Sequence, residues 1–317
     1  MSELVSIIML TYNHARWVEK AIRSILAQET QYSFKLYIND DASTDGTQDI
    51  IRKLESEYPD LICCTYQKEN QYSQGVNICR TFLYPMVHGE YIAFCEGDDY
   101  WIDTKKLQKQ IDYMEKHDEC TFCFSNASIV DIDGNPIRKF YSKYSWNDRT
   151  IIKKLKDTNG ADFDVDEMLL LDFTPTASTV FRYDTLAELF NYQNSLDLLT
   201  RLVATNMGYA HYHNEIFTAY RVGNEQSASG SIQHSYEKLK KKFYDLHVTI
   251  LKEFNSRTKQ KYSKTIEHVI KRKEITLYLA SGKEYLSRVW TIDCWNELPT
   301  KRKINLIIKY FIYRFGF

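Results

Sequence analysis

The 317-residue sequence lacks several features that would assign it to a class of protein at once. No apolar run approaches the ~20 residues that a membrane-spanning helix needs, so we expect no integral membrane segment. Lysine and arginine (41) almost balance aspartate and glutamate (42), and the formal net charge of -1 creates no overall field that favours nucleic acid or an acidic partner. Internal repeats and low-complexity tracts are also absent. The remaining composition, 44% apolar and 26% charged, is typical of a soluble globular protein.

We expect no signal peptide, because MSELVSIIML leads directly into an expected strand. The seven cysteines are an odd number and lie scattered, mostly within apolar stretches. We therefore expect free thiols and a reducing, cytoplasmic location. Cys120 and Cys123 have the spacing of a chelating pair. Positions three apart on a strand face opposite sides, however, which predicts neither a shared metal nor a redox pair.

The first 130 residues alternate strand and helix patterns. Nearly continuous apolar runs, as expected of strands buried on both faces, occupy 5–12, 34–38, 61–67 and 91–95. Segments with helical spacing of apolar residues separate these runs and follow the last one. This order predicts an α/β fold with a parallel sheet and right-handed crossovers, and the length suffices for one large or two closely joined units.

The pattern is less regular after residue 120. Residues 120–140 predict two strands joined by a turn at 133–135, and 141–170 predict loop with a short helix. A strand, a helix ended by Gly208 and another strand are expected at 178–183, 195–208 and 211–222. From 234 onward the chain is rich in lysine and helical in pattern.

Three polar motifs fall at the ends of expected strands: TYN (11–13), NDDASTDGT (39–47) and EGDDYW (96–101). Ligands of parallel α/β sheets bind beyond the carboxyl ends of the strands, so we expect these motifs to converge. Crowded carboxylates at such an edge favour a hard divalent cation, Mg²⁺ or Mn²⁺, which offsets their repulsion and can hold a diphosphate. The alternative is a solvated acidic turn that binds nothing.

The order and spacing of VSIIMLTYNHARWVEKAIRSILAQ, INDDASTDGT and GEYIAFCEGDDYW resemble the family 2 glycosyltransferases of GT-A fold. The resemblance is strong over residues 4–130 and weak to about 225. It implies a Rossmann-like, mostly parallel sheet flanked by helices, with a GT-A domain at 1–230 and a helical, basic extension at 231–317. Within the domain, 1–130 would bind the nucleotide sugar and 131–230 the acceptor. The implied activity is inverting transfer of a sugar from a nucleotide diphosphate sugar, most commonly a UDP-sugar, to a glycan or lipid-linked acceptor.

The resemblance also implies residue roles in donor binding. Thr11 and Tyr12 would contact the donor, with Tyr12 stacked on the base, and Asp41 would accept a hydrogen bond from a base N–H. Arg80 matches an arginine that the family places near the donor, although an exposed helix charge is an equally good interpretation. Arg221 would pair with the diphosphate.

The implied metal ligands are Glu96, Asp98 and Asp99, at the position of the family's Asp-x-Asp motif. Asp98 would be the main ligand, and Glu96, a glutamate where the family has aspartate, would contact ribose or metal. Trp101 is expected to pack below the site. Asp40 is expected to be a structural partner, and Asp45 to hold the next helix start.

The resemblance implies a catalytic base at the start of the helix that ends at Gly208, and Asp197 is the candidate. A register shifted by two would place Ser195 there instead, and a serine is a poor base. The family often has histidine where this chain has Gly223. His211 and His213 share one face of a strand and are expected to pack or to form hydrogen bonds rather than to bind metal.

The last segment, 301–317, carries five basic residues and no acid, interleaved with apolar and aromatic ones. It suits a helix on an anionic membrane surface, or equally a terminal helix packed on the domain. Two rival functions differ from transfer. A nucleotidyltransferase would show a glycine-rich basic loop after its first strand, where this chain has TYNHARW. A non-catalytic module that binds a sugar nucleotide or a partner would keep the fold without turnover.

Overall fold

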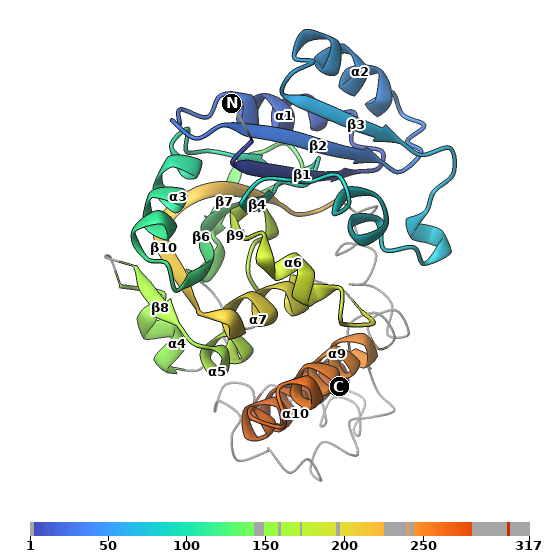
Figure 1. Cartoon of the computed structure of the whole chain (residues 1–317). Coiled ribbons are helices and arrows are strands. Elements are labelled where there is room, and N and C mark those ends of the chain that lie inside the picture. Colours follow the sequence, from blue (N-terminus) through green and yellow to red (C-terminus); the bar gives the residue numbers. More distant parts are fainter. Residues whose placement is uncertain are drawn as a thin grey trace. The chain divides into compact units, whose positions relative to one another are not determined.

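The structure, a computed structural model, describes residues 3–142, 149–157, 160–171, 173–194, 197–224, 240, 244–280 and 303–304. The chain forms two compact units, residues 1–223 and 224–317, and each is described by itself. The first unit contains one ten-stranded sheet with helices packed on it (Figure 1).

Four parallel strands form the amino-terminal part of this sheet in the order β3-β2-β1-β4. Their bounds are Val5–Thr11 for β1, Phe34–Asp40 for β2, Ile62–Tyr66 for β3 and Tyr91–Phe94 for β4. β1 pairs with β2 from Val5 opposite Phe34 to Thr11 opposite Asp40, so both strands end at the same edge. The four predicted strands are therefore confirmed.

Helices α1 (Val18–Leu26) and α2 (Thr47–Glu57) contact each other beside these strands (Figure 1). The buried positions of α1 follow helical spacing and pack on the apolar side chains of β1 and β2 in one core. This packing explains why the sequence pattern alone locates the elements. Members of that core are Val5, Ile7, Met9, Val18, Ala21, Ile22, Ile25, Leu36 and Ile38.

The rest of the sheet is mixed. Its order continues β4-β9-β6-β10-β5, with β7 on β6 and β8 on β10. The pair β6–β10 is parallel, whereas β9, β5, β7 and β8 join antiparallel. The bounds are Tyr100–Trp101 (β5), Cys120–Val130 (β6), Pro136–Lys139 (β7), Ala161–Phe163 (β8), Val180–Arg182 (β9) and Tyr209–Arg221 (β10).

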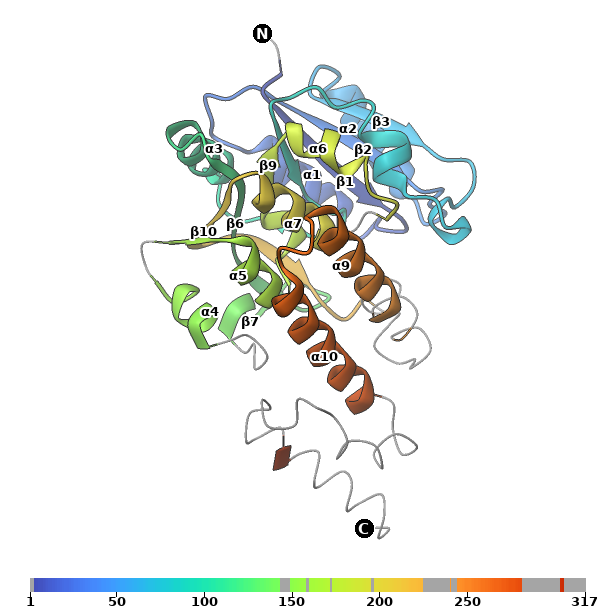
Figure 2. The same cartoon turned by 60° about the horizontal axis from the view of Figure 1, so that its bottom comes forward.

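The helices of this part are α3 (Lys106–Lys116), α4 (Arg149–Lys154), α5 (Val165–Leu170), α6 (Asp184–Leu189) and α7 (Asp197–Met207). The turned view of Figure 2 shows α5, α6 and α7 together near β9 and β10. The β6–β7 hairpin, β9, α7 and β10 match the sequence predictions. The strand β8 and the helix α6 were not predicted.

The structure contradicts the expectation that Cys120 and Cys123 face opposite sides of a strand. Their sulfur atoms lie 3.7 Å apart in the core. The reason is a bulge, because Tyr209 and Ala210 of β10 pair with Cys120 and Phe122 and leave Thr121 as an extra residue. The six cysteines in the described part of the chain are free thiols.

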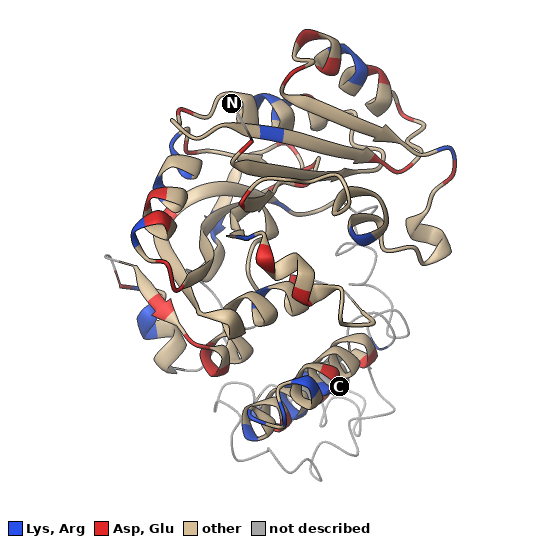
Figure 3. Cartoon of the chain, in the orientation of Figure 1, with Lys and Arg blue, Asp and Glu red and all other residues tan. Residues whose placement is uncertain are grey.

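The second unit contains a helical hairpin of α9 (Leu246–Arg257) and α10 (Ser263–Ala280), in the part expected to be helical. Phe254 of α9 stacks on Tyr262, with ring centroids 5.7 Å apart. α10 carries residues of both charges (Figure 3). Apart from 303–304, residues 301–317 lie outside the described residues. No helix in the described part of the chain is long and apolar enough to cross a membrane.

Candidate active site

The three polar motifs meet at the carboxyl end of β1, as the sequence predicts. On one side of that strand, Gly97 N donates a hydrogen bond to Leu10 O at 3.0 Å. On the other side, Asp41 N donates to Thr11 O, also at 3.0 Å. Asp41 and the acidic turn of residues 96–99 therefore flank one strand end.

The segment after β1 is tied to the loop after β2. Asn13 N donates to Ser43 Oγ at 2.8 Å, and His14 N donates to Thr47 Oγ1 at 2.8 Å. Asn13 adopts the left-handed backbone region with a φ of 55°, which asparagine tolerates better than most residues. These contacts fix the backbone directly after the exposed Tyr12 side chain.

The acidic turn fits closely against that segment because residue 97 is glycine. A β-carbon on Gly97 would lie 2.8 Å from His14 Nδ1 and 2.9 Å from Thr11 Oγ1. Both of these atoms are buried and have no hydrogen-bond partner. Buried polar atoms are usually paired, so two such atoms at one strand end indicate a place for a ligand or an ordered water.

The two aspartates after β2 have different surroundings. Asp40 is buried and accepts hydrogen bonds from Ser43 N at 3.0 Å and from Gln48 Nε2 at 2.6 Å, which confirms the expected structural role. Asp41 accepts hydrogen bonds from Gln71 N at 2.7 Å and Tyr72 N at 3.0 Å. A carboxylate oxygen has two lone pairs, so each oxygen of Asp41 keeps capacity to accept another hydrogen bond.

Asp45 holds the start of α2, as expected. Its carboxylate accepts hydrogen bonds from Thr47 N at 3.1 Å and from Ala15 N at 3.0 Å. These hydrogen bonds to the charged form lower the pKa of Asp45 even though burial acts to raise it.

The carboxylates of the acidic turn are crowded and poorly compensated. Burial raises the pKa of Glu96 to about 8, with further contributions from Asp197 and Asp98, and its Oε2 has no hydrogen-bond partner. Burial also raises the pKa of Asp99 well above its ordinary value, and the charges of Asp98 and Glu96 raise it further. The Oδ2 atom of Asp98 lies 3.8 Å from His14 Nε2. The turn therefore has a strong local preference for a positive charge.

Arg221 holds this turn through backbone atoms. Its Nε donates to Asp98 O at 2.8 Å, and its Nη1 donates to Asp131 O and Ile132 O at 3.0 and 2.9 Å. Its own backbone N–H donates to Asp99 Oδ1 at 2.8 Å. Arg221 is thus a buried clamp on the acidic turn, and three of its hydrogen bonds end on carbonyl oxygens.

Asp197 lies at the same site, at the first residue of α7. Its Oδ2 accepts a hydrogen bond from Thr176 Oγ1 at 2.9 Å, and it is one of the groups that raise the pKa of Glu96. Loss of hydration around its carboxyl group raises the pKa of Asp197, whereas Thr176 and Arg201 act in the opposite direction. Ser195, the alternative of the shifted register, lies outside the described residues.

The other candidate residues have structural contacts. Arg80 donates from Nη1 to Tyr192 O at 2.5 Å and from Nη2 to Phe190 O at 2.8 Å, so it joins two segments rather than standing as a free helix charge. Trp101 is buried and donates from Nε1 to Ala177 O at 3.0 Å, which confirms its packing role.

Sequence reasoning missed two residues of this site. Thr176 contacts the carboxylate of Asp197, but it sits in TPTAST, a stretch without a periodic or charge signal. His14 faces Asp98 and Gly97 and is the residue directly after TYN, so extending that motif by one position would have found it.

The side chains of the site supply only part of the set of ligands that a divalent cation needs. Within the described ranges, no group of three or more His, Cys, Asp or Glu residues is arranged to hold a metal ion. Asp98 and Glu96 offer carboxylate oxygens in an acidic turn, and the remaining ligands of a hard cation would be diphosphate oxygens and water. The chemistry therefore fits a cation that binds together with a nucleotide.

A family model described as glycosyl transferase family 2 matches residues 6–177, which is more than half of the chain. The chain belongs to glycosyltransferase family 2. This membership confirms the family that the three motifs resemble and places the chain in a family of transferases, and the α/β GT-A fold class is confirmed with it.

Three curated relatives illustrate the membership. The uncharacterized protein Rv1520 of Mycobacterium tuberculosis is 34% identical over 178 residues, 56% of this chain and 46% of that protein. The putative teichuronic acid biosynthesis glycosyltransferase TuaG of Bacillus subtilis is 30% identical over 71% of this chain and 82% of its own length. WfaP of Escherichia coli, named a UDP-Glc:alpha-D-GlcNAc-diphosphoundecaprenol beta-1,3-glucosyltransferase, is 38% identical over 40% of this chain and 47% of its own length. The matched part thus spans about half the length of Rv1520 and WfaP.

Two solved structures share the fold. TarS 1–349 of S. aureus in complex with UDP-GlcNAc aligns with a TM-score of 0.60 at 16% identity, over 99% of this chain and 92% of that one. The mannosyltransferase PcManGT of Pyrobaculum calidifontis, in complex with GDP-Man and Mn2+, gives a TM-score of 0.57 at 14% identity over 100% and 88%. At these identities the likeness shows the fold alone.

Proposed function

We propose that this chain is an inverting glycosyltransferase that moves a sugar from a nucleotide diphosphate sugar to a glycan or lipid-linked acceptor. The observation that carries the proposal is the meeting of Asp41, the acidic turn and Asp197 around the end of β1, where Thr11, His14 and Glu96 each bury an unpartnered polar atom. A donor with a base, a diphosphate and a sugar has the polar groups to pair with such atoms.

The nucleotide would lie between the ends of β1 and β2. Tyr12 is exposed, so its ring is accessible for stacking on the base, and the buried Asp41 keeps free lone pairs for a base N–H. Thr11 Oγ1 is an unpaired hydroxyl on the same strand end. UDP is the nucleotide proposed, since the TarS complex and the name of WfaP both contain it.

Arg80 and Arg221 are proposed to support the donor by holding its surroundings. Arg221 fixes the backbone of the acidic turn, and Arg80 fixes residues 190–192. An N–H of either guanidinium that makes no bond to a carbonyl would be the group available to a diphosphate oxygen.

A divalent cation, Mn²⁺ or Mg²⁺, is proposed to bind at Asp98 with Glu96 and Asp99 nearby. When bound, such an ion supplies positive charge that stabilises the departing diphosphate. Glu96 has to lose its proton before its carboxylate can contact a cation, and Asp99 is held by Arg221 N. Asp98 is therefore the carboxylate most available as a ligand.

Asp197 is proposed as the general base. An inverting transfer is one in-line displacement at C1 of the sugar, and the attacking hydroxyl must give up its proton. The raised pKa of Asp197 improves its ability to accept that proton, and Thr176 Oγ1 orients the carboxylate by donating to Oδ2. The other oxygen, Oδ1, is left to face the acceptor hydroxyl.

The acceptor is proposed to be a glycan or a lipid-linked glycan, as in the name of WfaP, handled at the cytoplasmic face of a membrane. The basic segment 301–317 would contribute a peripheral membrane contact there. Residues 131–223 would supply the acceptor side of the site.

Thermal-shift screening of nucleotide sugars with and without Mn²⁺ tests the donor proposal, because a ligand that binds only the folded chain raises its melting temperature. Full-length protein should be stabilised by one nucleotide sugar more than by its nucleotide, and more with Mn²⁺ than with EDTA. Hydrolysis or transfer of that donor then tests turnover. Binding without any turnover would favour the non-catalytic module instead.

A further inference from the structure

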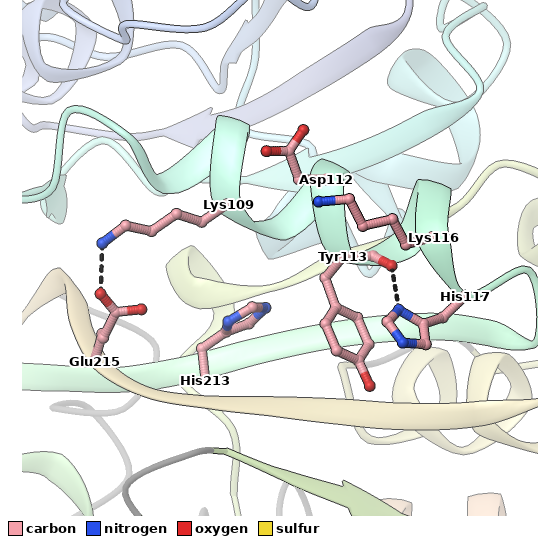
Figure 4. Close-up of a pocket in the computed structure, with 7 residues that line it drawn as sticks. All are labelled: Lys109, Asp112, Tyr113, Lys116, His117, His213 and Glu215. Carbon is pink, nitrogen blue, oxygen red and sulfur yellow. Dashed lines mark hydrogen bonds and ion pairs between the residues drawn. The ribbon is translucent and has the colours of Figure 1, made fainter.

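A pocket of about 360 Å³ opens between α3 and the first half of β10, and no residue of the acidic turn lines it (Figure 4). Lys109 and Tyr113 of α3 form one wall together with His117, the residue just after that helix, and His213 and Glu215 of β10 form the other. None of these residues takes part in the proposed transfer. We propose that this pocket is a second binding site, which holds an uncharged sugar unit of a glycan chain.

The first argument is a rigid aromatic wall. The ring of Tyr113 lies between two imidazoles, with centroid distances of 4.1 Å to His117 and 3.6 Å to His211 and nearly parallel planes. The hydroxyl of Tyr113 donates to Asp162 Oδ1 at 3.1 Å, which fixes the ring. The two imidazoles cover both faces of the Tyr113 ring, so the flat surface left for a sugar ring is the outer face of the exposed His117, whose Nδ1 is held at 2.8 Å from Tyr113 O.

The second argument is an unsatisfied polar atom. Figure 4 shows the His213 ring directed into the pocket between Lys109 and Tyr113, and its Nε2 is buried without a hydrogen-bond partner. Burial, with the neighbouring His211 and lysine charges, lowers the pKa of His213 to about 3, so the imidazole is neutral at physiological pH. A ligand hydroxyl can pair with either tautomer of a neutral imidazole, because it both donates and accepts.

The third argument is charge balance. Lys109 forms ion pairs with Asp103 and Glu215. Asp112 accepts hydrogen bonds from Tyr32 Oη at 2.7 Å and Gln108 Nε2 at 2.8 Å, and Lys116 also acts on it. Figure 3 shows both basic (blue) and acidic (red) positions on α3. Two amines and two carboxylates leave no net field, so neither a phosphate nor a cation is favoured, whereas hydroxyl groups can use both kinds of partner.

The position sets the role of the pocket. Glu215 and Arg221 lie six residues apart on β10, which corresponds to at most about 20 Å along a strand, and less where the pairing with β6 is irregular. A sugar in the pocket therefore leaves the donor site open. Resting on the proposed function, the pocket is a second point of attachment for a polymeric acceptor or product, and two linked points of attachment bind a chain more tightly than one.

Saturation-transfer NMR on the full-length chain tests this proposal. The probes are linear tetrasaccharides of β-linked glucose and of β-linked N-acetylglucosamine, with UDP and Mn²⁺ in excess to fill the donor site. We expect saturation transfer to at least one tetrasaccharide, with about tenfold weaker binding in Glu215→Ala and in His213→Phe, as one lost hydrogen-bonding group implies. Asp118→Ala, an exposed position just beyond α3, is the matched control and should bind like the unchanged chain.

Absence of saturation transfer to both tetrasaccharides would overturn the proposal, as would unchanged binding in Glu215→Ala and His213→Phe variants that melt like the unchanged chain. Displacement of the tetrasaccharide by inorganic phosphate would also contradict it, since that result requires an anion site. The readout is binding rather than turnover. A chain that transfers no sugar can still pass this test, and an active transferase can fail it.

Discussion

At the scale of single residues, the site is a set of carboxyl groups that differ in surroundings. Asp40 and Asp45 are satisfied by hydrogen bonds and hold loops. Glu96 is half-buried, Asp197 is exposed, the charge of Asp197 acts on Glu96, and each of the two has a raised pKa. Groups of one chemical type therefore divide, according to their environment, into members held by hydrogen bonds and members with a raised pKa.

Asp197→Asn tests the general base. The amide keeps the shape and can still accept the hydrogen bond from Thr176, but it cannot take a proton, so kcat should fall by about 10²–10⁴-fold with little change in KM for the donor. Steady-state kinetics with saturating acceptor measure both constants. An unchanged kcat would show that another residue is the general base, and the transferase proposal would still hold.

Glu96 gives a pH dependence of stability. Its pKa is about 8 in the folded chain against an ordinary value of 4.5, so between these values the folded chain holds a proton that the unfolded chain releases. The contribution to the free energy of unfolding is complete below pH ~4.5 and is lost as the pH rises through about 8. In EDTA, the melting temperature of Glu96→Gln relative to the unchanged chain should therefore rise from pH 5 to pH 8.5.

Thermal denaturation of both proteins across that range measures the difference. Parallel curves for the two proteins would show that Glu96 ionises at an ordinary pKa. Asp60→Asn, an exposed carboxylate just before β3, is the control and should run parallel to the unchanged chain.

At the scale of elements, the acidic turn depends on close backbone packing after β4. Gly97→Ala would place a methyl group against His14 and Thr11, and overpacking of this kind costs ~1–3 kcal/mol. We expect loss of both stability and nucleotide-dependent stabilisation, measured by thermal shift with UDP and Mn²⁺.

Gly208→Ala is the matched variant. Its β-carbon would meet Glu119 O at 2.1 Å, so it should also lower the melting temperature, but it lies at the end of α7 and not against the acidic turn. The Gly208→Ala protein that remains folded should still show a higher melting temperature when UDP is added. Equal loss of the UDP response in both variants would mean that Gly97 acts only through global stability.

The elements that could be predicted from sequence are those whose pattern is set by burial. β1, β2 and α1 form one core, and a buried parallel strand needs a continuous apolar run that is visible in the sequence. β8 was missed because three residues, Ala161–Phe163, become a strand only by pairing with β10. The Cys120–Cys123 contact was missed because a bulge depends on the register with β10, which no local pattern encodes.

The site was predictable to the extent that its residues fall at strand ends. Asp41 and the acidic turn follow from that rule, and their meeting at β1 is confirmed. The position of Asp197 came from the family resemblance, and Thr176 came only from the structure, since tertiary packing alone brings it to that carboxylate. The carbonyl contacts of Arg221 and Arg80 were likewise outside the reach of sequence reasoning.

At the scale of the whole molecule, the family model covers residues 6–177, and the basic segment 301–317 lies beyond it. We predict that the segment binds anionic membranes, because five basic residues and no acid attract such a surface. Flotation with liposomes that contain anionic lipid should recover the full-length chain, and the recovery should fall with rising salt.

The control is the full-length chain with Lys301→Glu, Arg302→Glu and Lys303→Glu. It should float markedly less than the unchanged chain, and neither protein should float with neutral liposomes. Identical recovery of the two proteins on anionic liposomes would show that these basic residues do not attract the segment to membranes.

The central claim is that Asp41, the acidic turn and Asp197 surround a cation and a nucleotide at the end of β1. Isothermal titration of Mn²⁺ into full-length protein with UDP present tests it most directly. The account predicts saturable binding of Mn²⁺ that is lost in Asp98→Asn and retained in Asp60→Asn. No Mn²⁺ uptake in the presence of UDP, or equal uptake by Asp98→Asn, would contradict it.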